Sequence, residues 1–231
     1  MVDQGAQGCA ADRNRTKVLI VGDHPIMREG IRLLLEQQED LMVCGEAENL
    51  VDAQRAIEAQ AHDVALLDLS LKESSGLELV RNLRQCKEEL RILALSIREE
   101  PFYAERILRA GANGYVTKDD GTACLIEGIR TILTGQIYIS DKMAARMIRI
   151  FVGGGGERGV PLIQNLTDRE LEVFELIGQG LTTRLIAKKL HLSIKTIGSH
   201  REHIKDKLRL TNTTDLLRQA IQWAQLPSES A

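Results

Sequence analysis

Short apolar runs alternate with helical patterns through the first half of this 231-residue chain. Five aliphatic runs have the length of buried strands, and apolar residues at helical spacing follow each of them. The runs lie at residues 17–21, 41–44, 64–67, 92–95 and 114–116. The helical patterns begin near Pro25, Leu50, Gly76, Pro101 and Gly121. This alternation predicts βαβ units, and therefore an α/β domain with a doubly wound five-stranded parallel sheet over residues 16–138.

The pattern changes after this domain. A helical stretch over residues 141–151 leads into "VGGGGERGVP", whose glycines and proline predict a linker, so 139–165 reads as a helical extension and linker. The glycine spacing also fits a phosphate-binding loop, but Val160 and Pro161 stand where that loop needs Lys and Ser or Thr. We therefore favour the linker.

The last part of the chain, residues 166–226, reads as a small all-α domain. Thr167 and Glu170 have the spacing of a helix capping box, and Ser193 is placed to cap a longer basic helix. A short helix and a tight turn precede Ser193. Helix, short helix, turn and longer helix, in that order, predict a helix-turn-helix.

Polar side chains stand at the carboxyl ends of four predicted strands. The run in "VALLDLSLKESSG" ends in Asp68, while Asp23, Ser96 and Lys118 follow the first, fourth and fifth runs. A lone buried carboxylate is most simply a helix or turn cap, because burying an unpaired charge is costly. In a doubly wound sheet of flavodoxin-like order, however, these strand ends converge. Two carboxylates suit Mg²⁺ and the Lys and Ser suit phosphate, so the group is able to take a phosphoryl group on Asp68.

Charge is unevenly distributed along the chain, whose net charge is −3. Residues 182–210 carry eight basic and two acidic side chains, a local balance of +6. Such a patch is typical of nucleic-acid contact, although a solvated helical face has the same composition.

Two sets of motifs resemble a known family. "VGDHP", "VALLDLSLKESSGLEL", "LALSIREE" and "ILRAGANGYVTKD" resemble the receiver domain of two-component response regulators. "LTDRELEVFELI" and "IAKKLHLSIKTIGSHREHIKDKL" are similar to the LuxR-type helix-turn-helix of the NarL/FixJ family. The resemblance runs from about Lys17 to Trp223. It implies a transcription regulator phosphorylated by a sensor histidine kinase, with no enzymatic activity beyond slow self-dephosphorylation.

The resemblance also assigns roles to single residues. It implies that Asp68 is the phosphoacceptor, that Asp23 and Asp68 hold Mg²⁺, and that Ser96 and Lys118 contact the phosphoryl group. Tyr115 falls at the family's aromatic switch, although the residue pattern alone favours a rim aromatic packed on the last helix. The active protein is expected to be a homodimer on double-stranded DNA.

The longer basic helix has an apolar and a polar face. We expect Ile194, Ile197, Ile204 and Leu208 to pack on the domain core. By the family match, Gly198, Ser199 and Glu202 face base edges. Other residues expected to bind DNA, mostly by contacting phosphates, are Lys188, Lys195, Thr196, Arg201, Lys205 and Lys207. His200 and His203 have a spacing that a metal could use, but no third ligand is evident, so we expect them to pack or touch DNA.

Two positions depart from the family pattern. Gly22 stands where the family has an acid, and it reads either as a residue for a tight turn or as a lost outer metal contact. Lys72 stands where the family often has proline, and it is either a solvated loop residue or a contact for the incoming phosphate.

Two other functions stay open: a degenerate receiver that binds DNA without phosphorylation, and an Asp-nucleophile phosphatase. The phosphatase would need an acid at Ser70.

Nothing in the sequence predicts a membrane protein. The first fifteen residues lack an apolar core of the signal-peptide type, and no stretch approaches 18 apolar residues. The four cysteines form no metal-binding spacing. We expect a cytoplasmic protein that does not contact a membrane.

Overall fold

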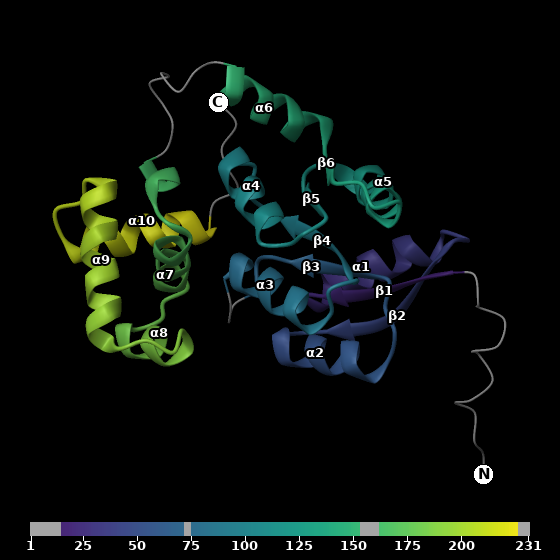
Figure 1. Ribbon diagram of the computed structural model, residues 1–231, viewed down its shortest axis with the longest axis horizontal. Coiled ribbons are helices and arrows are strands. Elements are labelled where there is room, and N and C mark those ends of the chain that lie inside the picture. Colours follow the sequence, from purple (N-terminus) through teal and green to yellow (C-terminus); the bar gives the residue numbers. More distant parts are fainter. Residues whose placement is uncertain (1–14, 72–74, 153–161, 226–231) are drawn as a thin grey trace, which may run out of the picture.

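The computed structural model describes residues 15–71, 75–152 and 162–225. Its first half is a parallel six-stranded sheet between two layers of helices (Figure 1). The strands are β1 Thr16–Val21, β2 Leu41–Ala47, β3 Val64–Asp68, β4 Arg91–Ser96, β5 Gly114–Thr117 and β6 Tyr138–Ile139. Their order is β2-β1-β3-β4-β5-β6, which confirms the doubly wound prediction. The short β6, which the sequence pattern did not indicate, adds one strand beside β5.

The helices divide between the two faces because strand side chains alternate. One helix follows each of the first five strands: α1 Pro25–Glu36, α2 Leu50–Ala59, α3 Gly76–Cys86, α4 Pro101–Arg109 and α5 Gly121–Leu133. One face of the sheet packs with α1 and α5, through residues such as Leu35 and Ile129. The other face packs with α2, α3 and α4, through residues such as Ile57, Leu83 and Ile107. All five predicted helix starts are confirmed.

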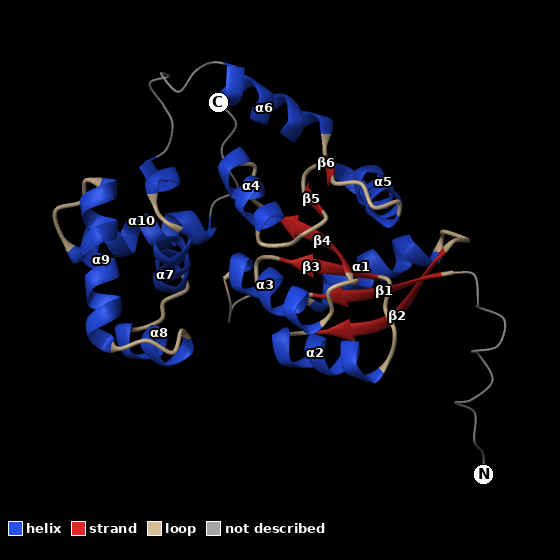
Figure 2. Ribbon diagram, viewed as in Figure 1, coloured by secondary structure: helices blue, strands red, loops and turns tan. Residues whose placement is uncertain are grey.

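The second half of the described chain is helical (Figure 2). After α6 Asp141–Val152, its elements are η1 Leu162–Asn165, α7 Asp168–Gly178, α8 Thr183–Lys189, α9 Ile194–Leu208 and α10 Thr213–Gln225. The predicted linker and the rejected phosphate loop fall mainly on residues 153–161, which lie outside the described residues. The helix-turn-helix is present, with α8 and α9 joined at His191, whose φ is 52°.

The capping prediction at the start of α7 is confirmed. Glu170 N donates to Thr167 Oγ1 at 3.3 Å, and Thr167 N donates to Glu170 Oε2 at 2.7 Å. Ser193 likewise caps α9, accepting from Thr196 N at 3.0 Å.

One packing prediction on α9 is wrong: Ile194 is 56% exposed. It is the first residue of the helix, and the residues of α9 that pack in the core are Ile197, Ile204 and Leu208.

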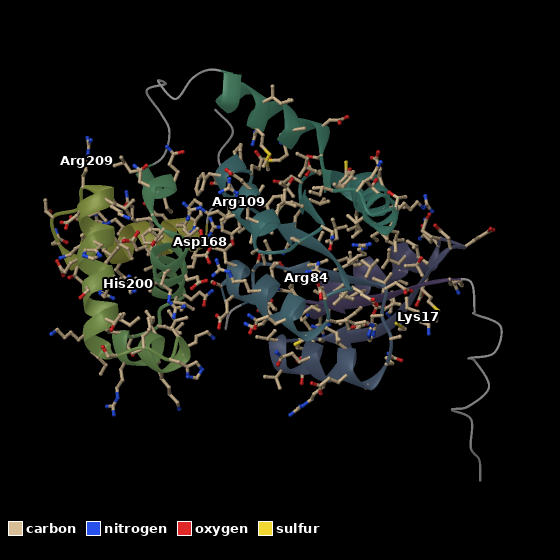
Figure 3. All side chains as sticks on the ribbon, viewed as in Figure 1. Lys17, Arg84, Arg109, Asp168, His200 and Arg209 are labelled. Carbon is tan, nitrogen blue, oxygen red and sulfur yellow. The ribbon has the colours of Figure 1, made fainter. Side chains whose placement is uncertain are left out.

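The two domains contact each other through α3 and α4 on one side and α7 and α10 on the other (Figure 1). Arg81 on α3 pairs with Asp168 and Glu172 on α7, each at 2.7 Å. Arg106 on α4 donates to the carbonyls of Gln164 and Leu166 at 2.8 and 2.6 Å. Asp168 lies between the domains, whereas His200 and Arg209 lie on α9, on the side away from the sheet (Figure 3). The interface therefore leaves α9 uncovered by the first domain.

No helix within the described part of the chain has both the length and the hydrophobicity that a membrane crossing requires.

Candidate functional site

Asp68 lies at the carboxyl edge of the sheet, where β3 ends. Its side chain is fully buried, and its charge is paired: Lys118 Nζ donates to Oδ2 at 2.9 Å. The backbone N of Ser70 donates to Oδ1 at 2.9 Å. Lys118 follows β5, two strands away from β3, and its backbone N donates to Ser96 O at 2.7 Å. The fold therefore brings together the carboxylate and the ammonium that the sequence pattern placed at separate strand ends.

Asp23 offers the second carboxylate of the site. Both of its oxygens are buried and have no hydrogen-bond partner among the described residues. His24 Nδ1 approaches Oδ1 to 2.6 Å, but the contact does not have hydrogen-bond geometry. One ligand atom from each of Asp23, His24 and Asp68 lies within 4.8 Å of the others. Buried carboxylate oxygens without donors are suited to a hard divalent cation such as Mg²⁺, so these residues fit the metal that the family implies.

The side chains of Ser96 and Tyr115 both hydrogen-bond the backbone of Arg98. Ser96 is the last residue of β4, and its Oγ accepts from Arg98 N at 3.0 Å. Tyr115, on β5, donates its hydroxyl to Arg98 O at 2.7 Å. Burial raises the pKa of Tyr115, which keeps the phenol protonated as a donor. Tyr115 is fully buried, so the alternative of a rim aromatic is wrong.

The site as a whole combines a nucleophilic oxygen with cationic support. Asp68 supplies the carboxylate, Lys118 neutralises negative charge beside it, and Asp23 can hold a cation on the other side. Such an arrangement stabilises the charge that develops on a phosphoryl group during its transfer. Ser70 occupies the position that a phosphatase would need for a second acid. Lys72 lies outside the described residues.

The outward face of α9 carries the residues predicted to read DNA. Lys195, Ser199 and Glu202 are exposed, and Gly198 and Thr196 are half-buried beside them. Lys188 is exposed on α8. The first turns of the helix therefore present polar groups to solvent, as a helix that enters a major groove requires.

Three of the basic residues on α9 differ in how freely they can reach a phosphate. Arg201 is half-buried. Lys205 has a largely buried side chain, 16% exposed, and its Nζ pairs with exposed Glu202 at 2.8 Å. Lys207 Nζ instead lies 2.6 Å from Oε2 of Glu170, whose side chain is 5% exposed. Lys207 thus pairs with the capping box of α7, a position that the sequence pattern did not indicate.

Comparison with known proteins agrees with both halves of this geometry. Residues 18–130 match the family model of the response regulator receiver domain, and residues 164–220 match that of bacterial regulatory proteins of the luxR family. Oxygen regulatory protein NreC of Staphylococcus carnosus is 32% identical over 209 residues, which are 89% of this chain and 96% of NreC. This chain belongs to the NarL/FixJ family of response regulators.

Solved structures of this family share the fold of this response regulator. RcsB of Salmonella enterica serovar Typhimurium, bound to promoter rprA in the presence of the phosphomimetic BeF₃⁻, has a TM-score of 0.73 and 29% identity, over 90% of this chain and 99% of RcsB. A structure of two RcsB dimers bound to two parallel DNAs has a TM-score of 0.56 and 28% identity, over 89% and 97%. The response regulator described here is therefore a transcription regulator with a receiver domain followed by a LuxR-type helix-turn-helix.

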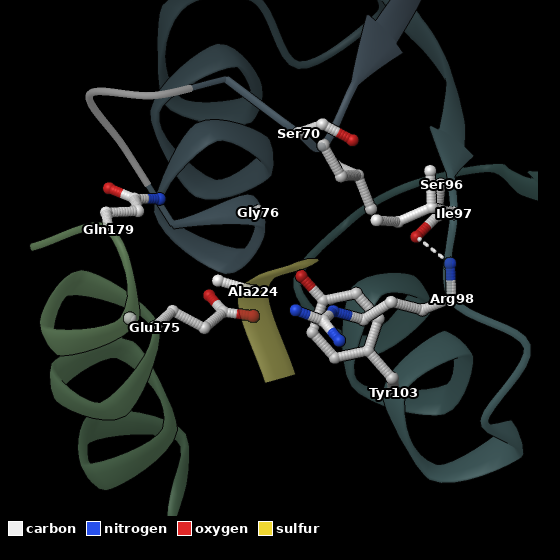
Figure 4. A pocket seen from close by; sticks show the side chains of 11 residues that line it. Ser70, Gly76, Ser96, Ile97, Arg98, Tyr103, Glu175, Gln179 and Ala224 are labelled. Carbon is white, nitrogen blue, oxygen red and sulfur yellow. Dashed lines mark hydrogen bonds between the residues drawn. The ribbon is translucent and has the colours of Figure 1, made fainter. Parts of the chain in front are cut away.

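Sequence reasoning did not identify the residues that join the two domains of this response regulator. Arg98 and Tyr103 from the receiver domain face Glu175 on α7 and the end of α10 (Figure 4). Together with Ser96 and Gln179 they line a cavity of about 430 Å³ between the domains. Glu175 is buried, and this burial raises its pKa, with Arg98 opposing the shift. Glu175 gave no sequence signal, because a glutamate on an amphipathic helix is ordinarily solvated.

Proposed function

We propose that this response regulator accepts a phosphoryl group on Asp68 from a sensor histidine kinase. In this step the phosphorus–nitrogen bond of a phosphohistidine breaks, an Asp68 oxygen bonds to phosphorus, and the imidazole leaves. Lys118 and the Ser96 hydroxyl contact the transferred group, and Tyr115 follows the change at Ser96. Mg²⁺ held by Asp23 and Asp68 supplies positive charge. The observation that supports this proposal most directly is the 2.9 Å pairing of buried Asp68 with Lys118, next to the Asp23 carboxylate, whose buried oxygens accept no hydrogen bond from the described residues.

The output of the proposed function is sequence-specific binding of double-stranded DNA through α9. Gly198, Ser199 and Glu202 face the bases, and the other contacts come from Lys188, Lys195, Thr196, Arg201, Lys205 and Lys207. The active form is a homodimer, in line with the dimers in the RcsB–DNA structure. We place the receiver domain at 16–138, the helical extension and linker at 139–165 and the DNA-binding domain at 166–226. The protein acts in the cytoplasm, and its only catalytic property is slow self-dephosphorylation.

Intact mass after incubation with acetyl phosphate and Mg²⁺ tests the assignment of Asp68. The wild-type chain should gain one phosphoryl group, and Asp68→Asn should gain none, because the amide is not a nucleophile for this transfer. Asp63→Asn is the matched control, since Asp63 directly precedes β3, at the opposite end of that strand. Equal labelling of wild type and Asp68→Asn would refute the assignment.

A further inference from the structure

The segment between β4 and α4 is held by both switch residues. Arg98 N donates to Ser96 Oγ at 3.0 Å, and Arg98 O accepts from the Tyr115 hydroxyl at 2.7 Å (Figure 4 draws the first bond). Ser96 and Tyr115 are both buried. The Arg98 backbone depends on both side chains for these hydrogen bonds, so a movement of Ser96 or Tyr115 moves this backbone or breaks one of the two bonds.

The side chain of the same residue reaches the DNA-binding domain. Arg98 Cζ lies 3.6 Å from the ring centroid of Trp223 on α10, and the arginine is 8% exposed. Trp223 also stacks on Phe102, with ring centroids 6.0 Å apart, and meets Tyr103 edge-on at 6.1 Å. A guanidinium over an indole face, shielded from water, is among the stronger cation–π arrangements. Arg98 therefore contacts the phosphorylation machinery with its backbone and α10 with its side chain.

We propose that Arg98 and Trp223 couple the state of Asp68 to the position of the DNA-binding domain. This inference rests on the proposed function of Asp68. In this structure the Ser96 side chain is turned toward Arg98 N, so it has to rotate about its Cα–Cβ bond to bring the hydroxyl to a phosphoryl oxygen. That rotation draws Oγ away from Arg98 N, and the segment then rearranges to recover a partner. The guanidinium leaves the Trp223 ring, and the end of α10 separates from the receiver domain.

The neighbouring residue strengthens this assignment. Glu99 is 5% exposed, and it pairs with Lys142 at 2.6 Å and with Arg146 at 2.7 Å, both on α6. The Lys142 ammonium lowers the pKa of Glu99 and so keeps its carboxylate charged. Two successive residues therefore hold α10 on one side and α6 on the other. A rearrangement of this short segment acts on both helices at once.

The interdomain ion pairs of Arg81 are not placed to sense phosphorylation. The ion pairs of Arg81 with Asp168 and Glu172 stabilise the closed arrangement, but Arg81 lies on α3 and makes no hydrogen bond or ion pair with Ser96, Tyr115 or Lys118 in the described chain. The closed arrangement also leaves the outward face of α9 exposed. The coupling therefore controls the attachment of α10 and the orientation of the domain, and not the accessibility of the recognition helix.

Trp223 is the only tryptophan of the chain, so its fluorescence reports this contact directly. We expect beryllofluoride with Mg²⁺ to shift the emission of the full-length wild type to the red and to raise its quenching by acrylamide. Arg98→Gln should show the shifted, quenchable emission before beryllofluoride is added and respond little afterwards. Arg98→Lys, which keeps the charge but not the planar group, should fall between the two. Arg109→Gln is the matched control, because Arg109 is an exposed arginine on α4 and should respond like wild type.

The failure of this coupling can be told apart from failure of the proposed function. Intact mass with acetyl phosphate shows whether Asp68 is labelled, and Asp68→Asn shows whether the fluorescence change depends on it. Labelled wild type with unchanged emission and quenching would overturn the coupling and leave the phosphoacceptor assignment standing. A response of Arg98→Gln as large as that of wild type would also overturn the coupling. Absence of label would overturn both.

Discussion

Gly22 shows how one missing side chain alters a site. Its backbone is not in the left-handed region, so the turn after β1 does not require glycine, and the structure does not support the tight-turn interpretation. A Cβ built at Gly22 would lie 2.8 Å from Met27 Cε and 3.4 Å from Asp68 Cβ. Met27 Cε is the end of a flexible side chain, which can move aside. A side chain at this position would therefore reach the surroundings of Asp68 at little cost.

Gly22→Asp should tighten Mg²⁺ binding. An added carboxylate beside Asp23 and Asp68 supplies an outer contact to the ion, and the loss of such contacts typically costs about 10–100-fold in metal affinity. Without metal, the third carboxylate should lower the free energy of unfolding by like-charge repulsion. Calorimetric titration with Mg²⁺ measures the first effect and urea denaturation the second. Gly30→Asp on α1 is the control, since its Cβ would contact nothing within 4 Å; equal Mg²⁺ affinities of wild type and Gly22→Asp would contradict the prediction.

At the scale of the element, α9 has two faces: one is the expected DNA-binding surface, and the other packs in the core of the helical domain. Its exposed face carries Lys195, Ser199 and Glu202, whereas Ile197, Ile204 and Leu208 are buried. Lys207 belongs to the structural side by its contact with Glu170 at 2.6 Å. The proposal that Lys207 contacts DNA phosphates therefore competes with a role in stability.

Lys195→Ala and Lys207→Ala should separate these roles. Lys195 is exposed, so its loss should reduce the log–log salt slope of DNA binding by about 1 without changing stability. Lys207→Ala leaves the buried carboxylate of Glu170 without its cation, and should lower the free energy of unfolding by about 1–2 kcal/mol, less than for a fully buried pair. Salt-dependent binding assays and urea denaturation measure the two effects. A full loss of one unit of slope in Lys207→Ala, with unchanged stability, would show that the phosphate contact prevails.

The elements that could be predicted from sequence are those whose signals are local. Strand runs, helix starts and the Thr167–Glu170 cap depend on neighbouring residues, and all were confirmed. The short β6 could not be predicted, because two residues carry no period and gain their partners only from β5. Gly178 gave no signal either: a Cβ there would lie 2.2 Å from Ala220 O on α10, and only the assembled helices show this close approach. Ile194 was wrongly predicted to be buried, because helical periodicity identifies the apolar face of a helix but not the point along the helix where the core ends.

At the scale of the whole molecule, the interface encloses a carboxyl group. Glu175 is 6% exposed and faces Arg98 and Tyr103 across the interface, with Glu172 on its own helix and Trp223 on α10. Burial raises its pKa above the ordinary value of 4.5, although Arg98 opposes the shift. The closed arrangement therefore binds this proton more tightly than an open arrangement in which Glu175 faces water.

The closed arrangement should weaken as pH rises. Because the pKa of Glu175 is raised in the closed state, the stabilisation is complete below about pH 4.5 and is lost as pH increases through the raised value. Trp223 quenching should increase across that range in wild type, and less so in Glu175→Gln, which stays neutral. Glu78 and Glu100 also have raised pKa values from burial and titrate in both proteins, so the difference between the curves isolates Glu175. Glu202→Gln, at an exposed site, is the control; superimposable curves for wild type and Glu175→Gln would contradict the prediction.

The site and the interface differ in how far sequence could predict them. Asp68 and Ser96 end their strands, Lys118 directly follows β5, and Asp23 comes two residues after β1, so the parallel topology alone brings them to one edge. Arg98 and Trp223 lie 125 positions apart in the chain on separate domains, and no periodicity relates them. Their contact depends on the packing of whole domains, which local patterns do not encode.

Arg98 contacts α10 and Glu99 contacts α6 within the same chain, so the strength of these contacts does not depend on the concentration of the protein. Both domains belong to one chain, so Trp223 meets Arg98 at an effective concentration on the order of millimolar, as tethered groups do. A contact too weak to join separate proteins is sufficient under these conditions. Weakening this contact by about 1.4 kcal/mol changes the ratio of closed to open molecules tenfold. Closure is therefore a property of each chain by itself, unaffected by dilution, whereas any dimer that follows from opening responds to how much protein the cell contains.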